Sequence, residues 1–259
     1  MRNFKSLVLL QILGIFLGLF ATQKEAGAVI QFNGKYEVVD SGSLIVDMGV
    51  TPVTVGNALK PYGMIYELLN NYNVYVNWSI LPGKGVGGID FSHNGKDYIG
   101  GPFIIPPEYR TPQVDSVIAE WMSEGVEIDT AVSDFTAYIF GSIVYWPIAT
   151  LDQQSSSIAI DYYQNADIPS SAYNLKLPTQ LDNCDDIFIM PHADPTWATH
   201  SNVRDWDRDN KGYFWASCRA VSIMEGINAP GDTSLRMNFL STNGLQCYDN
   251  NKCGSLITE

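Results

Sequence analysis

Gly212-Tyr213-Phe214-Trp215-Ala216-Ser217-Cys218 is an apolar run that follows a glycine and ends in a cysteine. The next residues, Arg219-Ala220-Val221-Ser222-Ile223-Met224-Glu225, place apolar side chains at helical spacing. Together they predict a buried strand that turns through small residues into a helix, with Cys218 at the turn, as in a nucleophile elbow. A helix N-terminus also favours a thiolate. The alternative is a structural cysteine, because cysteine packs well as a small buried hydrophobe.

The N-terminus has the three parts of a secretory signal peptide. Basic residues precede an apolar run from Leu7 to Ala21, and Ala26-Gly27-Ala28 supplies a small-residue cleavage site. The run is short for a membrane span and contains polar and glycine positions. We therefore predict removal of residues 1–28, a mature chain that begins near Val29, and a secreted, periplasmic or cell-surface location.

Composition limits the classes of partner. The chain has 259 residues, is 46% hydrophobic and carries a net charge of −13. Such an acidic chain has no basic stripe to neutralise phosphates, which argues against nucleic acid and against anionic membrane surfaces. No apolar stretch after the signal is long enough to span a membrane. The remaining chain of about 230 residues suits one large domain or two small ones. No cofactor is predicted, and the oligomeric state stays open.

Predicted strands and helices alternate along the mature chain. Short apolar runs indicate strands, whereas Leu59–Tyr72 and Pro112–Ser123 have apolar residues at helical spacing. Asn94-Gly95 between two β-like flanks predicts a hairpin. The alternation predicts a flavodoxin-like α/β fold, with a mostly parallel sheet and helices on both faces.

Two similar halves are predicted. The first covers residues 29–135 and includes the hairpin as an insertion, and the second covers residues 143–259 and ends in a tail. The joint is expected at Ser133–Ser142. A weak internal repeat supports this division, because Phe103-Ile104-Ile105-Pro106 parallels Phe188-Ile189-Met190-Pro191.

Chemically active side chains follow several strands of the second half. Cys218, His192 with Asp194, and Asp152 each come directly after a predicted strand, so a parallel sheet would bring them to its carboxyl edge. There Cys218 could act as nucleophile and His192 as base, with Asp194 or Asp152 orienting the imidazole. For His200 a structural role is favoured. A metal site of His192, Asp194 and His200 is the competing interpretation, but the spacing fits no compact zinc pattern, and no metal is predicted.

The four cysteines are expected in an oxidising environment after export. Cys247 and Cys253 enclose a short polar loop and are the predicted disulfide. Cys184 precedes its strand whereas Cys218 follows its own, so parallel strands would hold the two sulfurs at opposite ends of the sheet, too far apart for a bridge. We therefore predict that Cys218 is a free thiol.

The second half resembles a class I glutamine amidotransferase-like (flavodoxin-like) domain. The likeness rests on Ile148-Ala149-Thr150-Leu151-Asp152, on Ile187–Pro191 and on Phe214-Trp215-Ala216-Ser217-Cys218-Arg219-Ala220. In that family the cysteine after the central strand is the nucleophile, which the resemblance carries over to Cys218.

Two departures separate this sequence from the family pattern. Ala216 and Ala220 stand where the family has glycines around the nucleophile, and no histidine follows Cys218. The family's catalytic triad is therefore not carried over, and His192 would have to act from another strand.

A second resemblance involves Met190–His200 and Trp215–Cys218, which are similar to the N-terminal region of large secreted bacterial surface proteins. It implies that this chain could be the front of a longer protein.

Two functions are therefore predicted as alternatives. The first is a cysteine-dependent hydrolase or amidase acting on a small or peptide-like substrate. The second is a non-catalytic ligand-binding or scaffold module of a bacterial cell-surface protein. The substituted glycines and the missing downstream histidine favour the second.

Overall fold

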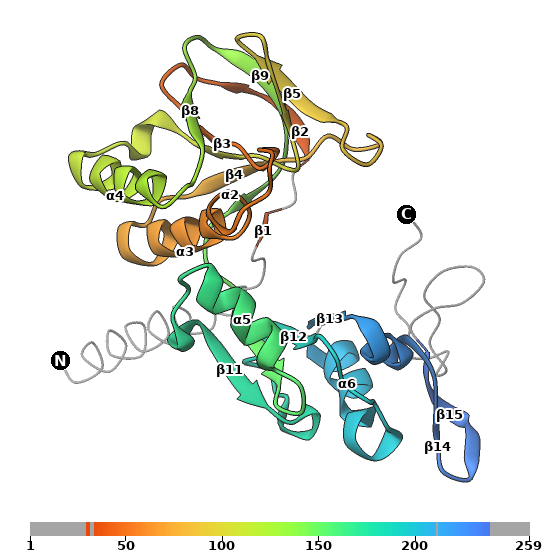
Figure 1. The fold of residues 1–259 in the computed structure, drawn as a ribbon. Coiled ribbons are helices and arrows are strands. Elements are labelled where there is room, and N and C mark those ends of the chain that lie inside the picture. The colour runs from red at the N-terminus through yellow and green to blue at the C-terminus, as the bar shows by residue number, and fades with distance from the viewer. Residues whose placement is uncertain (1–29, 32–33, 211, 239–259) are drawn as a thin grey trace, which may run out of the picture.

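The structure, a computed structural model, describes residues 30–31, 34–210 and 212–238. Two main sheets organise this part of the chain, one antiparallel and one parallel (Figure 1). The predicted signal peptide and the predicted Cys247–Cys253 disulfide lie outside the described residues. Within the described residues, no helix is both long and apolar enough to cross a membrane.

The antiparallel sheet has seven strands. Six of them follow the order β1-β9-β4-β7-β3-β8, and β2 also pairs with β9. The strands are β1 (Ile30–Gln31), β2 (Lys35–Val39), β3 (Leu44–Val46), β4 (Val76–Ser79), β7 (Phe103–Ile105), β8 (Ile128–Thr130) and β9 (Phe135–Ile143).

Four of these strands form two interleaved crossovers. The strands β3 and β4 run parallel and are connected through α2 (Val55–Ala58) and α3 (Lys60–Tyr72), whereas β7 and β8 are connected through α4 (Pro112–Ser123). Strand β7 lies antiparallel between β3 and β4, and β3 lies antiparallel between β7 and β8. This is the split βαβ arrangement of ferredoxin-like units.

Both faces of the antiparallel sheet are covered at its central strands β3 and β7. Helices α3 and α4 pack on one face, where Leu68 and Trp121 join a buried apolar cluster with Phe103 (Figure 1). The hairpin of β5 (Ile89–His93) and β6 (Lys96–Ile99) covers part of the other face, where Phe91 packs in a cluster with Ile104. A strand that is covered on both faces has a continuous run of apolar residues. It lacks the apolar–polar alternation of a strand with one face exposed to solvent.

Local sequence explains where these elements begin and end. Thr111 caps α4 by accepting a hydrogen bond from the Val114 amide (3.2 Å), and Pro112 occupies the first turn, where no amide donor is needed. In the hairpin turn, Asn94 and Gly95 have φ of 49° and 76°, the left-handed backbone that the Asn-Gly pair favours. The predicted hairpin and the two predicted helices are therefore confirmed.

The parallel sheet has four strands in the order β11-β10-β12-β13. Side chains of α6 and β12, including Trp206 and Phe188, form its buried apolar cluster. The remaining elements are β10 (Ala149–Asp152), β11 (Tyr173–Lys176), β12 (Ile187–Met190), β13 (Tyr213–Ala216), β14 (Glu225–Ala229), β15 (Asp232–Asn238), α5 (Ser157–Asn165), α6 (Trp197–Asn210) and the short 3-10 helices η1 (Pro107–Tyr109), η2 (Ser170–Ala172), η3 (Pro178–Gln180) and η4 (Cys218–Met224).

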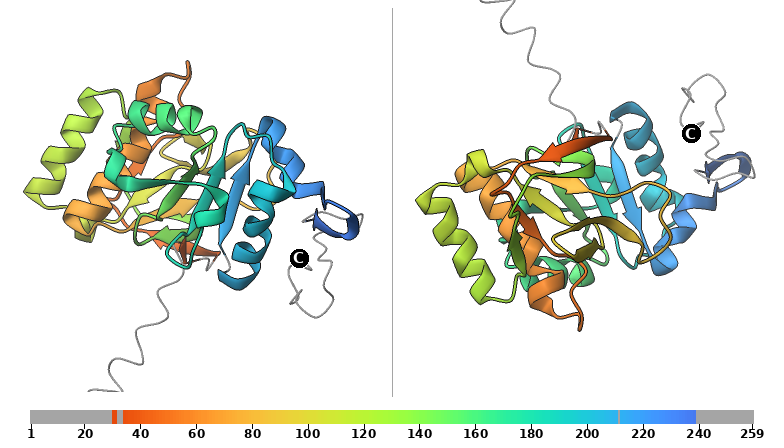
Figure 2. Two further views of the ribbon diagram at one scale, coloured as in Figure 1. Left: turned by 90° about the horizontal axis from the view of Figure 1, so that it is seen from below. Right: turned by 90° about the horizontal axis from the view of Figure 1, so that it is seen from above.

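Helix α3 contacts the segment that follows α5, and this contact lies between the antiparallel and the parallel part of the molecule. Lys60 forms ion pairs with Glu124 and with Asp167, which lies just after α5. Gly63 faces the Ala166 carbonyl so closely that a side chain would collide with it. Helices α4 and α6 lie on opposite sides of the molecule in both views of Figure 2.

The predicted fold class is wrong for the molecule as a whole. A mostly parallel, flavodoxin-like sheet was expected, but parallel pairing is confined to β10–β13, and the larger sheet is antiparallel. Buried runs such as Leu44–Val46 and Phe103–Ile105 have the same composition in either direction when both faces are covered. Strand direction was therefore not readable from the apolar pattern.

The predicted likeness between the two halves does not extend to the strand directions of the segments on which it rested. Strand β7 is antiparallel to both of its neighbours, whereas β12 is parallel to both of its own, so the two resembling segments occupy different environments. The expected joint at Ser133–Ser142 lies within β9, which pairs with β4 in the antiparallel sheet. The chain passes between the sheets after Ile143.

Candidate functional site at the carboxyl edge of the parallel sheet

Three neighbouring strands end together at one edge of the parallel sheet. Leu151 of β10 is level with Ile189 of β12, and Met190 of β12 is level with Ala216 of β13. The loops that carry Asp152, His192 with Asp194, and Cys218 therefore leave the sheet at the same edge, as the predicted strand directions required.

Hydrogen bonds join the three loops. The His192 amide donates to the Ser155 hydroxyl (3.2 Å), which links the loop after β12 to the loop after β10. The Ser217 hydroxyl donates to the Pro191 carbonyl (2.7 Å), which links the turn after β13 to the loop after β12. The edge is thus a connected surface and not three independent loops.

Cys218 stands at the predicted strand-to-helix turn. It is exposed, it is the first residue of η4, and its φ of 52° lies in the left-handed region. Residues other than glycine rarely adopt this backbone, and such outliers are common at functional sites. Within the described residues, however, no hydrogen bond joins its sulfur to an imidazole.

The two predicted orienting carboxylates contact other partners instead of His192. Asp194 forms an ion pair with Arg219 (2.8 Å), and both side chains are largely exposed. Asp152 is fully buried beside the imidazole of His200. The His192 ring is exposed. Within the described residues, no hydrogen bond or ion pair joins this ring to Cys218, Asp194 or Asp152.

The buried pair of Asp152 and His200 is the feature that the sequence did not predict. The His200 Nδ1 accepts a hydrogen bond from the Thr196 amide (3.3 Å) and contacts the Thr199 hydroxyl (2.6 Å). This arrangement assigns the proton of a neutral ring to Nε2, which lies 3.5 Å from Asp152 Oδ2. Neither of these two buried atoms has a hydrogen-bond partner within the described residues. The eight-residue spacing from His192 was the available signal, since it allowed the ring to point back to this edge.

The cysteines follow the predicted arrangement where the structure describes them. Cys184 and Cys218 are both free and exposed, and they lie before β12 and after β13, at opposite ends of two parallel strands. A bridge between them would need the strand direction to be different. Among the described residues, no three histidine, cysteine or acidic side chains are placed to hold a metal ion.

Asp207, in helix α6, has a side-chain carboxyl group that binds its proton more tightly than usual. Burial raises the pKa of Asp207 to about 6. Since its pKa in an unfolded chain is about 4, the folded state binds this proton more tightly. The stability that this proton adds is therefore complete below about pH 4 and is lost as the pH rises through about 6.

We expect Asp207→Asn to stabilise the fold near neutral pH, because an amide avoids the cost of burying a carboxylate. After allowance for partial exposure, the gain should be about 1 kcal/mol at neutral pH and close to zero under acidic conditions. Urea unfolding at both pH values measures it. Asp161→Asn, an exposed carboxylate of α5, is the matched control and should change little. An equal gain in both variants would indicate a general charge effect in this acidic protein.

Comparisons of the chain with protein-family models, with curated proteins and with solved structures give no match.

Proposed function

We propose that this chain is a non-catalytic ligand-binding or scaffold module of an exported, cell-surface protein. Its ligand is a small or peptide-like polar molecule held at the carboxyl edge of the parallel sheet. The observation that carries the proposal is that Asp152 and Asp194 both have partners other than His192. An imidazole without an orienting carboxylate, and without a hydrogen bond to the thiol, lacks the geometry of a general base.

The strand order indicates where such a ligand would bind. Strands β11 and β12 pair with opposite sides of β10, so the strand order reverses at β10. In open parallel sheets ligands occupy the crevice at this reversal, outside the carboxyl ends of the strands. In this sheet the corresponding position is between the loop of Gln153 and Gln154 and the loop of His192, and all three side chains are exposed.

These side chains suit a polar, uncharged ligand. Primary amides donate and accept hydrogen bonds, and a neutral imidazole does the same. The bond from the His192 amide to Ser155 fixes the distance between the two loops. Peptide groups and small hydroxylated molecules offer the complementary donors and acceptors.

A cysteine-dependent hydrolase or amidase is the second candidate. The left-handed backbone and the exposure of Cys218 favour it, because they raise the sulfur at a strand-to-helix turn. In this alternative a substrate would bring His192 to the thiol, since catalytic hydrogen bonds often tighten only when substrate binds. The resemblance to glutamine amidotransferase-like domains supports the thiol but not the base.

Alkylation by iodoacetamide separates the two functions, and the chain contains its own reference thiol. Cys184 is exposed at the other end of the same sheet. For a binding module we expect Cys218 and Cys184 to react within about threefold of each other near neutral pH, because binding needs no activated thiol. Peptide mapping by mass spectrometry measures each site separately.

The opposite outcome would support the hydrolase. A Cys218 rate that exceeds the Cys184 rate by about tenfold or more, and that changes little between mildly acidic and neutral pH, requires a stabilised thiolate. His192→Ala is the control for its cause. Loss of the excess rate in this variant would assign the activation to the imidazole and would overturn the binding-module proposal.

A further inference from the structure

A series of polar groups leads from the buried Asp152 to the surface at the start of α6. Asp152 Oδ2 lies 3.5 Å from His200 Nε2, and both side chains are fully buried. On the other side of the ring, Nδ1 lies 2.6 Å from the Thr199 hydroxyl oxygen. That oxygen lies 2.7 Å from the hydroxyl oxygen of the exposed Thr196. A carboxylate, an imidazole and a hydroxyl thus follow one another in the order of a catalytic triad.

The Thr196 backbone amide determines where the protons of this series lie. An amide can only donate, and this one donates to His200 Nδ1 (3.3 Å), so the proton of a neutral ring is on Nε2, facing Asp152. The Thr199 hydroxyl therefore donates to Nδ1, since the other acceptor within its reach, the Thr196 carbonyl oxygen, is farther away at 3.4 Å. His200 is consequently placed to take the Thr199 proton as a general base.

Capping of the helix does not account for the buried pair. The Thr196 hydroxyl caps α6 by accepting a hydrogen bond from an amide of the first turn (3.3 Å), and Thr111 caps α4 in the same way (3.2 Å) without a hydrogen bond to an imidazole. The facing atoms of Asp152 and His200 have no hydrogen-bond partner among the described residues, which is costly for buried polar groups. Such a cost in a native structure calls for an explanation, and a chemical role supplies one.

We propose that Thr199 is a nucleophilic threonine that accepts one acyl group from an activated ester or thioester. Its Oγ1 attacks the acyl carbonyl carbon, and the hydroxyl proton passes to His200 Nδ1. A new C–O bond forms, the bond from the carbonyl carbon to the leaving oxygen or sulfur breaks, and His200 returns the proton to the leaving group. Asp152 stabilises the imidazolium between these two steps.

The surroundings of Thr199 suit this reaction. Its side chain is partly exposed, and the amides of Trp197 and Ala198, in the first turn of the same helix, donate to no described residue. Such amides at a helix N-terminus stabilise a developing oxyanion. The product is an ester of a secondary alcohol, which is less reactive than the donor and therefore persists. One transfer per chain is not turnover, so this inference goes beyond the non-catalytic function proposed above and does not depend on it.

The test treats the full chain with p-nitrophenyl acetate, after iodoacetamide has blocked the accessible thiols, and locates acetyl groups by peptide mapping. Thr111 is the internal reference, because it is an exposed threonine that caps a helix without an imidazole. We expect Thr199 to be acetylated at least about a hundredfold faster than Thr111. Equal rates at the two threonines would overturn the proposal. This comparison uses the unchanged protein, so it does not depend on how well any variant folds.

Variants then test the role of each group. Thr199→Val should remove the initial release of p-nitrophenolate, and Thr199→Ser should retain it. Asp152→Asn should slow acetylation of Thr199 by about tenfold or more, whereas Asp161→Asn, the exposed control on α5, should change it by less than about twofold. Unchanged acetylation in folded Asp152→Asn protein, as judged by thermal unfolding, would refute the role of the buried pair. Sustained release of p-nitrophenolate that requires Thr199 would show turnover and would refute a stable acceptor.

Discussion

Replacing His200 with alanine is expected to lower the free energy of unfolding by about 3–5 kcal/mol. The imidazole is fully buried, and its Nε2 lies 3.5 Å from the equally buried Asp152 Oδ2. Truncation would leave a cavity beside a carboxylate that has lost its neighbour, and both effects oppose folding. Urea unfolding monitored by circular dichroism measures the loss.

The matched control is His192→Ala, which removes an exposed imidazole only eight positions earlier. It should change the free energy of unfolding by no more than about 0.5 kcal/mol. Adding Asp152→Asn to the His200→Ala protein should recover part of the loss, since a buried amide costs less than an unpaired carboxylate. A loss below about 1 kcal/mol for His200→Ala would contradict the close packing of this pair.

The second large effect is expected at Gly63 in α3. A Cβ atom there would lie 1.8 Å from the Ala166 carbonyl oxygen and 2.8 Å from a ring carbon of Trp121. Alanine normally favours a helix over glycine by about 1 kcal/mol, so the sign of the effect depends on this contact. Because the nearest atom belongs to the backbone, we expect Gly63→Ala to destabilise the protein by a net 2 kcal/mol or so.

Gly85→Ala provides the comparison for Gly63→Ala. An added Cβ at Gly85 meets no atom within 4 Å, so this variant should be nearly neutral in the same urea titration. If Gly63→Ala were as stable as the unchanged protein, the close approach of α3 to the segment after α5 would be wrong, and with it the contact between the two sheets.

Periodicity in the sequence identified individual elements well. In α4 the residues Val114, Val117, Ile118 and Trp121 were predicted to share one face, and all of them are buried. Helical spacing specifies a face directly, because the period of the helix is built into the pattern. Strand direction has no comparable signal once both faces of a sheet are covered, which is why β7 was assigned to the wrong kind of sheet.

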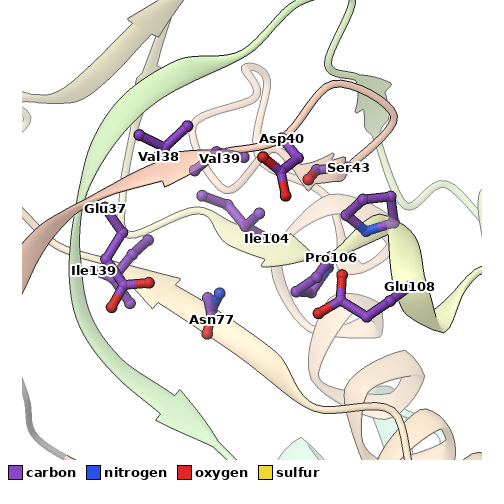
Figure 3. A pocket seen from close by; sticks show the side chains of 11 residues that line it. Glu37, Val38, Val39, Asp40, Ser43, Asn77, Ile104, Pro106, Glu108 and Ile139 are labelled. Atoms are coloured by element: carbon purple, nitrogen blue, oxygen red, sulfur yellow. The ribbon is translucent and has the colours of Figure 1, made fainter.

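For the candidate site, too, the sequence predicted where the residues lie but not which side chains contact one another. The positions of Asp152, His192 and Cys218 at one edge followed from the order of β10, β12 and β13, which are parallel. Their pairings did not follow, because the end of a strand does not specify the face on which the next side chain lies. Asp152 lies beneath α6, where His200 was available, and not beside His192. The sequence did not predict the hollow of about 150 Å³ among β2, β4, β7 and β9 (Figure 3), because its residues come from separate segments without a shared motif.

The interleaved crossovers of the antiparallel unit have a consequence for the order of assembly. The neighbours of β3 are β7 and β8, and the neighbours of β4 are β7 and β9, so the partners of both strands come later in the chain. A chain that emerges from its N-terminus can form the β5–β6 hairpin locally but cannot complete this sheet until β9 has been made. Such non-local pairing slows folding. Under the proposed export, this delay would keep the leading segment unfolded during its passage across the membrane.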